Sequence, residues 1–214
     1  MKTHVVPQRS PQILAQFVDP ANLCTLAGLV FTVWGLAGVL EGNLHQGALG
    51  IMGSTVCDIG DGFLARAMSK RSELKSRIGG VLDSLVDLAA GGLLGGACFV
   101  LLGGGSVFSV VVAVIFTCAL ACRLAYFTVV GLDGHSFIGV PVVANQLLVA
   151  GLLLVPWVRQ DGLAHYVVGG LMILTAAANV SMLRVPKPRG VWMALLACVA
   201  CAIAAAHVLQ WVMA

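Results

Sequence analysis

The chain has 214 residues, of which 59% are hydrophobic and only 10% are charged, and its mean hydropathy is +1.00. Soluble globular domains carry about 25% charged residues, so this composition excludes a water-soluble protein. The formal net charge of +3 is too small to indicate a nucleic-acid partner.

Residues 1–21 are the first segment, and they are polar and rich in proline. They lack the apolar core and the small-residue cleavage site of a secretory signal. We expect this segment to remain in the cytoplasm, where a helix could lie along the membrane interface. The remainder, residues 22–214, is expected to form a single transmembrane domain.

Apolar runs between turn-forming residues predict helical spans, since about 20 apolar residues are needed to cross a bilayer. The predicted spans are 22–40, 44–66, 79–102, 106–129, 138–157, 163–182 and 190–213. The sequence therefore predicts an all-α fold, a polytopic transmembrane helical bundle with about seven spans.

Lysine and arginine are distributed unevenly around these spans. With the N-terminus inside, the outer side holds only Arg159. The inner loops and span ends hold the other eleven: Lys2, Arg9, Arg66, Lys70, Arg71, Lys75, Arg77, Arg123, Arg184, Lys187 and Arg189. Because positive loops remain on the cytoplasmic side, this asymmetry predicts an inner N-terminus and an outer C-terminus.

The cysteines and histidines do not form a recognisable metal-binding pattern. The seven cysteines lie in apolar stretches, and we expect them to pack as small core residues: Cys24, Cys57, Cys98, Cys118, Cys122, Cys198 and Cys201. The five histidines show no pair at ligand spacing and receive no role: His4, His45, His135, His165 and His207.

Four carboxylates interrupt the second and third predicted spans. Asp58 and Asp61 are three residues apart, and Asp83 and Asp87 are four apart, so each pair lies on one face of its helix. An aspartate at the centre of a membrane helix costs about 3 kcal/mol, so four of them require partners. Oxygen-only ligands suit Mg²⁺, Mn²⁺ or Ca²⁺, which predicts a divalent and binuclear metal site.

Ion pairing or proton transfer could also account for these carboxylates. Arg66 and Arg77 could form buried ion pairs with them, but two cations cannot balance four anions. A proton relay in a cation- or proton-coupled transporter also uses intramembrane aspartates. A relay would account for the charges but not for the neighbouring glycines.

The complete pattern is Asp58-x-x-Asp61-Gly62-x-x-Ala65-Arg66, followed by Gly79-x-x-x-Asp83-x-x-x-Asp87. It resembles the signature of the CDP-alcohol phosphatidyltransferase family. Gly62, Ala65 and Gly79 fit this resemblance because a nucleotide can approach a helix backbone only where no side chain intervenes. One departure is the gap of twelve residues between Arg66 and Gly79, where family members more often have about eight. The additional residues fall in a charged loop, which can lengthen at little cost.

The resemblance implies roles for individual residues. Asp58, Asp61 and Asp83 would hold Mg²⁺ or Mn²⁺, as two divalent cations, on the donor diphosphate. Asp87 would ligate metal and also be the catalytic base that takes the proton of the attacking alcohol. The expected nucleotide and donor contacts are Asn22, Thr25, Gly62, Ala65, Arg66 and Gly79. Asn22 could instead be a helix N-cap, and Arg66 could be an interfacial arginine.

Three further stretches resemble the phosphatidylserine synthase branch of the family: Arg123-Leu-Ala-Tyr126-Phe127, Phe137-Ile-Gly139-Val-Pro141 and Ser181-Met-Leu-Arg184-Val-Pro186-Lys187. Tyr126 stands where that branch usually has a second arginine. The resemblance implies that Arg123, Arg184 and Lys187 bind the acceptor, although each is also explained as a positive residue anchoring the inner side. It covers most of residues 22–189 and leaves the seventh span outside.

We therefore expect a metal-dependent enzyme that transfers a phosphatidyl group from CDP-diacylglycerol to a small alcohol, L-serine in the first place, and releases CMP. The same reaction with inositol phosphate, glycerol phosphate, choline or a similar acceptor is the nearest alternative. The expected setting is a bacterial or archaeal cell membrane, among membrane lipids, with the site facing the cytoplasm. Gly91-x-x-x-Gly95 and Gly92-x-x-x-Gly96 permit close helix packing, either in a homodimer or within the chain.

Overall fold

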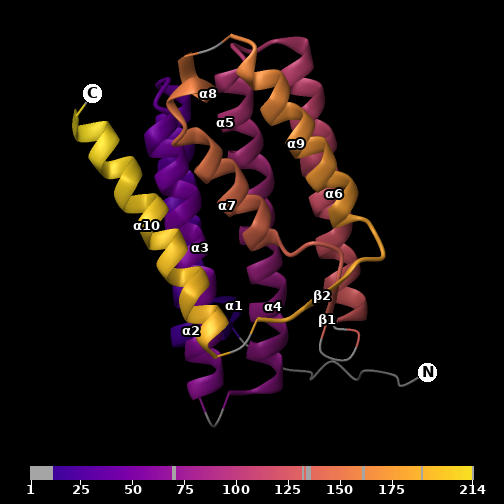
Figure 1. Cartoon of the computed structure of the whole chain (residues 1–214). Helices are drawn as coiled ribbons and strands as arrows, with labels where there is room; N and C mark the ends of the chain where they lie inside the picture. The colour runs from indigo at the N-terminus through magenta and orange to yellow at the C-terminus, as the bar shows by residue number, and fades with distance from the viewer. Residues whose placement is uncertain are drawn as a thin grey trace.

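The computed structural model describes residues 12–68, 71–131, 133, 136–160, 162–188 and 190–213. Most of them lie in helices that pack side by side as a bundle (Figure 1). The helices are α1 (Ile13–Phe17), α2 (Pro20–Leu40), α3 (Leu44–Ala67), α4 (Glu73–Asp87), the π-helical segment η1 (Leu88–Leu94), α5 (Gly95–Leu102), α6 (Val107–Val130), α7 (Val142–Leu153), α8 (Pro156–Gln160), α9 (Ala164–Asn179) and α10 (Val191–Met213). The predicted all-α bundle is confirmed. It also contains a small antiparallel pair of strands that the sequence did not reveal, β1 (Ser136–Ile138) and β2 (Arg184–Pro186).

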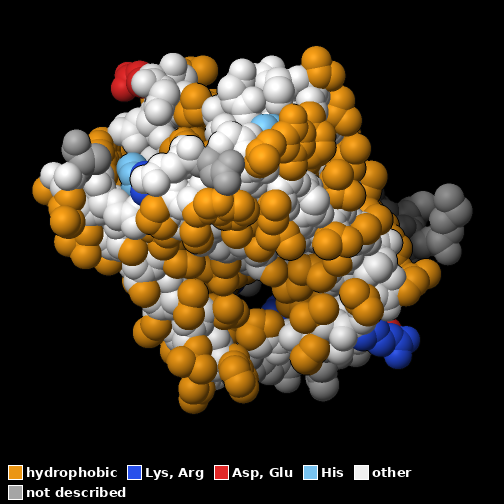
Figure 2. Space-filling view, turned by 45° about the horizontal axis from the view of Figure 1, so that its top comes forward, with side chains coloured by type: hydrophobic (Ala, Val, Ile, Leu, Met, Phe, Trp, Pro, Cys, Tyr) orange, Lys and Arg blue, Asp and Glu red, His pale blue; other side chains and the backbone are white. Residues whose placement is uncertain are grey.

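Several of these helices are suited to a membrane. Within the described ranges, four are long and apolar enough to span one: Pro20–Leu40, Glu73–Leu102, Val107–Val130 and Val191–Met213. Figure 2 shows hydrophobic side chains over most of the visible face, as expected of a surface that contacts lipid. The protein is therefore an integral membrane protein.

The predicted span 138–157 is wrong in its extent. The apolar helix in this region is α7, which has only 12 residues and rises about 18 Å, too little to cross a bilayer alone. Gly139, with a φ of +78°, and Pro141 end the strand β1 and delay the start of the helix. Pro156 begins the separate short helix α8, because proline is favoured in the first turn of a helix.

Side-chain caps set where the inner helix ends begin. The Asp19 carboxylate caps α2 by accepting a hydrogen bond from the Asn22 backbone N–H at 3.0 Å, so Asn22 is not the N-cap. Ser72 caps α4 in the same way through the Lys75 backbone N–H. Because of this cap, α4 begins at Glu73, earlier than the predicted start at residue 79.

Glycines bring neighbouring helices into close contact. A Cβ atom added to Gly35 on α2 would lie 2.8 Å from the Gly50 Cα atom on α3, so the two backbones pack directly against each other. On the third membrane helix, Gly91 faces the Val142 side chain and Gly96 faces Ala113. The paired glycines therefore pack helices within this chain.

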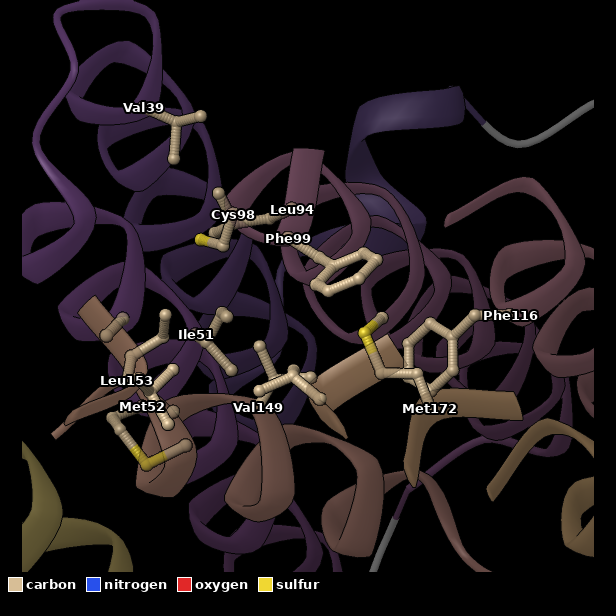
Figure 3. Packing of buried hydrophobic residues seen from close by; sticks show 14 of the residues in the cluster. Val39, Ile51, Met52, Leu94, Cys98, Phe99, Phe116, Val149, Leu153 and Met172 are labelled. Carbon is tan, nitrogen blue, oxygen red and sulfur yellow. The ribbon is translucent and has the colours of Figure 1, made fainter. Parts of the chain in front are cut away.

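The hydrophobic core lies between α3, α5, α6, α7 and α9. Phe99, Phe116, Ile51 and Met172 are almost completely buried there, as Figure 3 shows. Cys98 joins this core, whereas four other cysteines are exposed on the apolar surface: Cys118, Cys122, Cys198 and Cys201. The expectation of core positions was wrong for those four, because a small apolar side chain is equally suited to face lipid.

A hydrogen-bonded network fixes the far half of α10 to the bundle. The Arg159 guanidinium Nη1 donates to His45 Nε2 at 2.6 Å, and the two Nδ1 atoms of His45 and His207 lie 2.9 Å apart. His207 Nε2 donates to the Ala150 carbonyl oxygen at 2.9 Å. Because arginine can only donate and a carbonyl can only accept, both imidazoles must be neutral, with His45 donating to His207. Sequence reasoning missed this pair, which is 162 residues apart along the chain.

Candidate active site

Three carboxylates meet where α3 and α4 lie side by side. Asp58 comes from α3, and Asp83 and Asp87 come from successive turns of α4. One oxygen of each side chain lies within 4.8 Å of the others. Asp61, one turn beyond Asp58, stands slightly apart, and its Oδ2 accepts a hydrogen bond from the Thr25 hydroxyl of α2.

The carboxylate cluster lacks an ion-pair partner among the described residues. Within that part of the chain, neither lysine nor arginine forms a salt bridge with Asp58, Asp83 or Asp87. Arg66 is exposed and lies over the Phe63 ring, 4.9 Å from the ring centroid, and Arg77 is also exposed. The structure therefore gives no support to ion pairing by these two arginines. Convergent carboxylate oxygens without a salt-bridge partner in the described part of the chain fit a divalent metal such as Mg²⁺ or Mn²⁺.

Two cavities open on either side of the carboxylates. The first, which we call the aromatic cavity, has a volume of about 210 Å³ and is lined by all four aspartates together with Phe127 and Phe137. The second, which we call the glycine cavity, has a volume of about 220 Å³ and is lined by Gly79, Gly80 and the two aspartates Asp61 and Asp83. Asp61 and Asp83 thus belong to both cavities and form the boundary between them.

Two of the cations that line the aromatic cavity, Arg123 and Lys187, lie beside its aromatic rings. The Arg123 guanidinium lies beside two neighbouring rings, with its Cζ 5.7 Å from the centroid of Phe127 and 5.5 Å from that of Phe137. Arg123 is buried, and its Nε has no hydrogen-bond partner among the described residues. Lys187 Nζ lies 5.7 Å from the Phe137 centroid. A small anionic group entering this cavity would therefore find two positive charges near Asp87.

Arg184, the third cation expected to bind the acceptor, lies elsewhere. It forms a salt bridge of 2.9 Å with Asp133, and both side chains are largely exposed. The antiparallel pairing of β1 and β2 places Arg184 opposite Ile138, outside the set of residues that line the aromatic cavity. Alternation along a strand explains this outcome, because Val185 is more buried than its two neighbours.

The expected donor-binding residues divide between the two cavities. Asn22, Thr25, Ala65 and Gly79 line the glycine cavity, whereas Gly62 and Arg66 line the aromatic cavity. Arg71 also lines the glycine cavity, although the sequence suggested only an inner-side anchor for it. The only sequence feature that could have pointed to Arg71 is its position in the loop between Arg66 and Gly79, which is longer than is usual in the family.

Comparison with known proteins agrees with this arrangement. A search of curated proteins found no significant match to the chain. The sequence does match a family of known proteins over residues 19–213. This range includes α10, which is the seventh predicted span, so the expectation that this span lies outside the resemblance was wrong. The described aspartates, the two cavities and this match over nearly the whole chain lead to one conclusion: the chain belongs to the CDP-alcohol phosphatidyltransferase family.

Proposed function

We propose that this protein transfers a phosphatidyl group from CDP-diacylglycerol to a small alcohol, and that L-serine is the preferred acceptor. Family membership supports the general reaction, which moves a phosphatidyl group from a CDP-alcohol to an acceptor. The observation that carries the proposal is the cluster of Asp58, Asp83 and Asp87 between two cavities, one for each substrate.

In this proposal the donor head lies in the glycine cavity and reaches the carboxylates across Asp61 and Asp83. These two residues, with Asp58, would hold the divalent cations that the family generally requires. When bound, such cations neutralise the diphosphate and stabilise the departing CMP. The protein contributes positioning, because phosphoryl transfer depends chiefly on alignment and on electrostatic stabilisation.

The acceptor alcohol lies in the aromatic cavity. Its hydroxyl oxygen forms a new bond to the phosphorus of the phosphatidyl group, the bond between that phosphorus and CMP breaks, and the hydroxyl proton passes to Asp87. Arg123 and Lys187 are placed to receive a carboxylate such as that of serine, since both line this cavity. A phosphate-bearing acceptor would use the same two cations, so the acceptor must be identified by experiment.

The test is product formation by the purified full-length protein in detergent. CDP-diacylglycerol is incubated with isotopically labelled serine, inositol phosphate, glycerol phosphate or choline, and the labelled lipid is separated and identified. We expect phosphatidylserine as the main product, no product in excess EDTA, and recovery on addition of Mg²⁺ or Mn²⁺. A different labelled lipid would overturn the serine assignment, and full activity in EDTA would overturn the metal assignment.

The charge distribution supports a site on the cytoplasmic side. Arg66 at the end of α3, Arg71 and Lys75 at the start of α4 and Lys187 after β2 belong to the end of the bundle that carries the carboxylates, whereas Arg159 belongs to α8 at the other end (Figure 1). The short helix α1 exposes apolar side chains, which supports an interfacial position for this part of the N-terminal segment, and residues 1–11 lie outside the described range. A homodimer stays a prediction, and the glycines that suggested it pack within the chain.

A further inference from the structure

Arg71 reaches from the connection between α3 and α4 to the start of α2. Its Nη2 donates a hydrogen bond of 2.6 Å to Asn22 Oδ1, and its Nε lies 3.4 Å from Asp19 Oδ2. The side chain is only 13% exposed. Arg71 belongs to a charged loop, but its side chain packs against the membrane helices. Burying a charged group in this way costs free energy relative to leaving it in water.

The guanidinium lies directly on the bare backbone of α4. A Cβ atom added to Gly79 would lie 2.5 Å from Arg71 Nη2. Arg71 also lines the glycine cavity, whose wall carries Asp61 and Asp83 as well. A group that approaches Gly79 from this cavity must therefore contact Arg71.

Two of the residues expected to contact the nucleotide, Asn22 and Thr25, already have protein partners. Asn22 accepts from Arg71 through Oδ1 and donates to the Gln16 carbonyl through Nδ2 at 3.3 Å. The Thr25 hydroxyl is engaged with the Asp61 carboxylate and the Ala21 carbonyl. Asn22 therefore orients Arg71, and Thr25 orients Asp61, which leaves other groups to contact the donor.

Arg71 retains free hydrogen-bonding capacity. Within the described residues its Nη1 group and one hydrogen of Nη2 have no partner. Attachment of this region to the start of α2 does not by itself explain the position of Arg71. Lys75 on α4 already provides such an attachment, because its Nζ donates to the Val18 carbonyl at 3.0 Å. A guanidinium in the same cavity as two metal-binding carboxylates suits an anion that bridges them, and arginine matches the geometry of phosphate oxygens.

We propose that Arg71 is a donor-binding residue whose guanidinium contacts the diphosphate of the CDP-alcohol in the glycine cavity. This inference rests on the proposed function. It assigns phosphate recognition to the lengthened connection between α3 and α4, and it makes Asn22 a positioning residue.

The experiment compares Arg71→Gln with two matched variants in the full-length protein. Arg77→Gln removes an exposed positive charge from the same region, outside both cavities. Asp19→Asn breaks the salt bridge to Arg71 but retains a good helix N-cap. Initial rates are measured against CDP-diacylglycerol concentration, and thermal unfolding of each variant is followed in the same detergent.

For Arg71→Gln we expect the donor KM to rise roughly tenfold to a hundredfold, as for the loss of a hydrogen bond to a charged group. The kcat at saturating donor should change less than about threefold, and Arg77→Gln and Asp19→Asn should keep the donor KM of the original protein. Equal donor KM values for the Arg71 and Arg77 variants would overturn the inference. So would identical loss of stability and activity in Arg71→Gln and Asp19→Asn, because that result means a purely structural tie.

Failure of the proposed function gives a different result. In that case the unsubstituted protein forms no lipid product from CDP-diacylglycerol with any alcohol.

Discussion

Individual carboxylates in this site differ in which substrate they can meet. Asp61 and Asp83 line both cavities, whereas Asp58 and Asp87 line only the aromatic cavity. Arg123, a buried cation that lines the same cavity, interacts electrostatically with Asp87. In the proposed reaction, the electrostatic interaction of Asp87 with this cation distinguishes it from Asp58 and suits it to take the acceptor proton, and the two residues on the boundary are better placed to hold the donor.

Substitution of Asp87 by Asn should separate these roles. The amide keeps the shape but cannot accept the proton, so kcat should fall by roughly 10²–10⁴-fold. Donor binding with metal present should persist, because Asp58, Asp61 and Asp83 remain. Isothermal titration of CDP-diacylglycerol into Asp87→Asn and Asp61→Asn provides the comparison. Loss of donor affinity to the same extent in both variants would show that Asp87 is mainly a metal ligand.

Gly79 offers a test of the glycine cavity. In Gly79→Ala the new methyl group would contact Asn22 and lie 2.5 Å from Arg71 Nη2, so both side chains must move. We expect the donor KM to increase roughly tenfold while the protein remains folded. Gly170→Ala is the control, because a Cβ atom there meets nothing within 4 Å. An unchanged KM in Gly79→Ala would show that the cavity tolerates the methyl group.

At the scale of helices, apolar runs and the spacing of charged residues predicted the long helices and the position of the site. Turn-forming residues did not predict the short strands. The sequence placed α2, α3, α6 and α10 within a few residues of their ends, because each is a long apolar run bounded by turn-forming or capping residues. The spacing of Asp83 and Asp87 predicted a shared helix face, and their oxygens do converge. The strands β1 and β2 were missed because three-residue segments carry no periodicity, and their pairing depends on contacts across the chain.

The contact between α2 and α3 should be sensitive to a single methyl group. In Gly50→Ala the Cβ atom would lie 2.6 Å from the Gly35 Cα atom and 2.8 Å from the Phe31 carbonyl oxygen. Backbone atoms cannot move aside as a side chain can, so we expect a loss of about 1–3 kcal/mol in stability. Gly151→Ala, whose Cβ would make an ordinary contact of 3.9 Å with Ile203, should unfold at nearly the original temperature. Thermal unfolding in detergent measures both.

At the scale of the whole molecule, α10 connects the two ends of the bundle. Met193 and Leu196 in its first half line the aromatic cavity, and His207 in its second half joins the buried hydrogen-bond network with His45 and Arg159. The rest of this helix is mostly exposed, consistent with a lipid-facing position. Its attachment therefore combines these polar contacts with the apolar packing of Ala200 and Ile203 against the core.

Replacement of His207 by Phe should weaken this attachment. The ring keeps its bulk, but His45 Nδ1 and the Ala150 carbonyl lose their partner, and each buried unsatisfied group costs about 1–3 kcal/mol. We expect a lower unfolding temperature and faster proteolysis near the C-terminus. Val208→Ala, at the next and more exposed position, is the control. Equal stability of the two variants would mean that the network contributes nothing to holding α10.

The π-helical segment η1 follows Asp87 directly, in the middle of the continuous helix Glu73–Leu102. A π-helical turn contains one more residue than an α-helical turn, as if a single residue had been inserted. Deleting one residue between 88 and 94 would allow a regular α-helix to form. In that shorter helix Asp83 and Asp87 would keep nearly their present orientation relative to the core residues Cys98 and Phe99. An α-helical segment that kept all its residues would instead rotate the two aspartates by about 100°, away from Asp58. The orientation of two site residues therefore depends on the π-helical turn that absorbs one extra residue, a property that hydropathy and composition do not register.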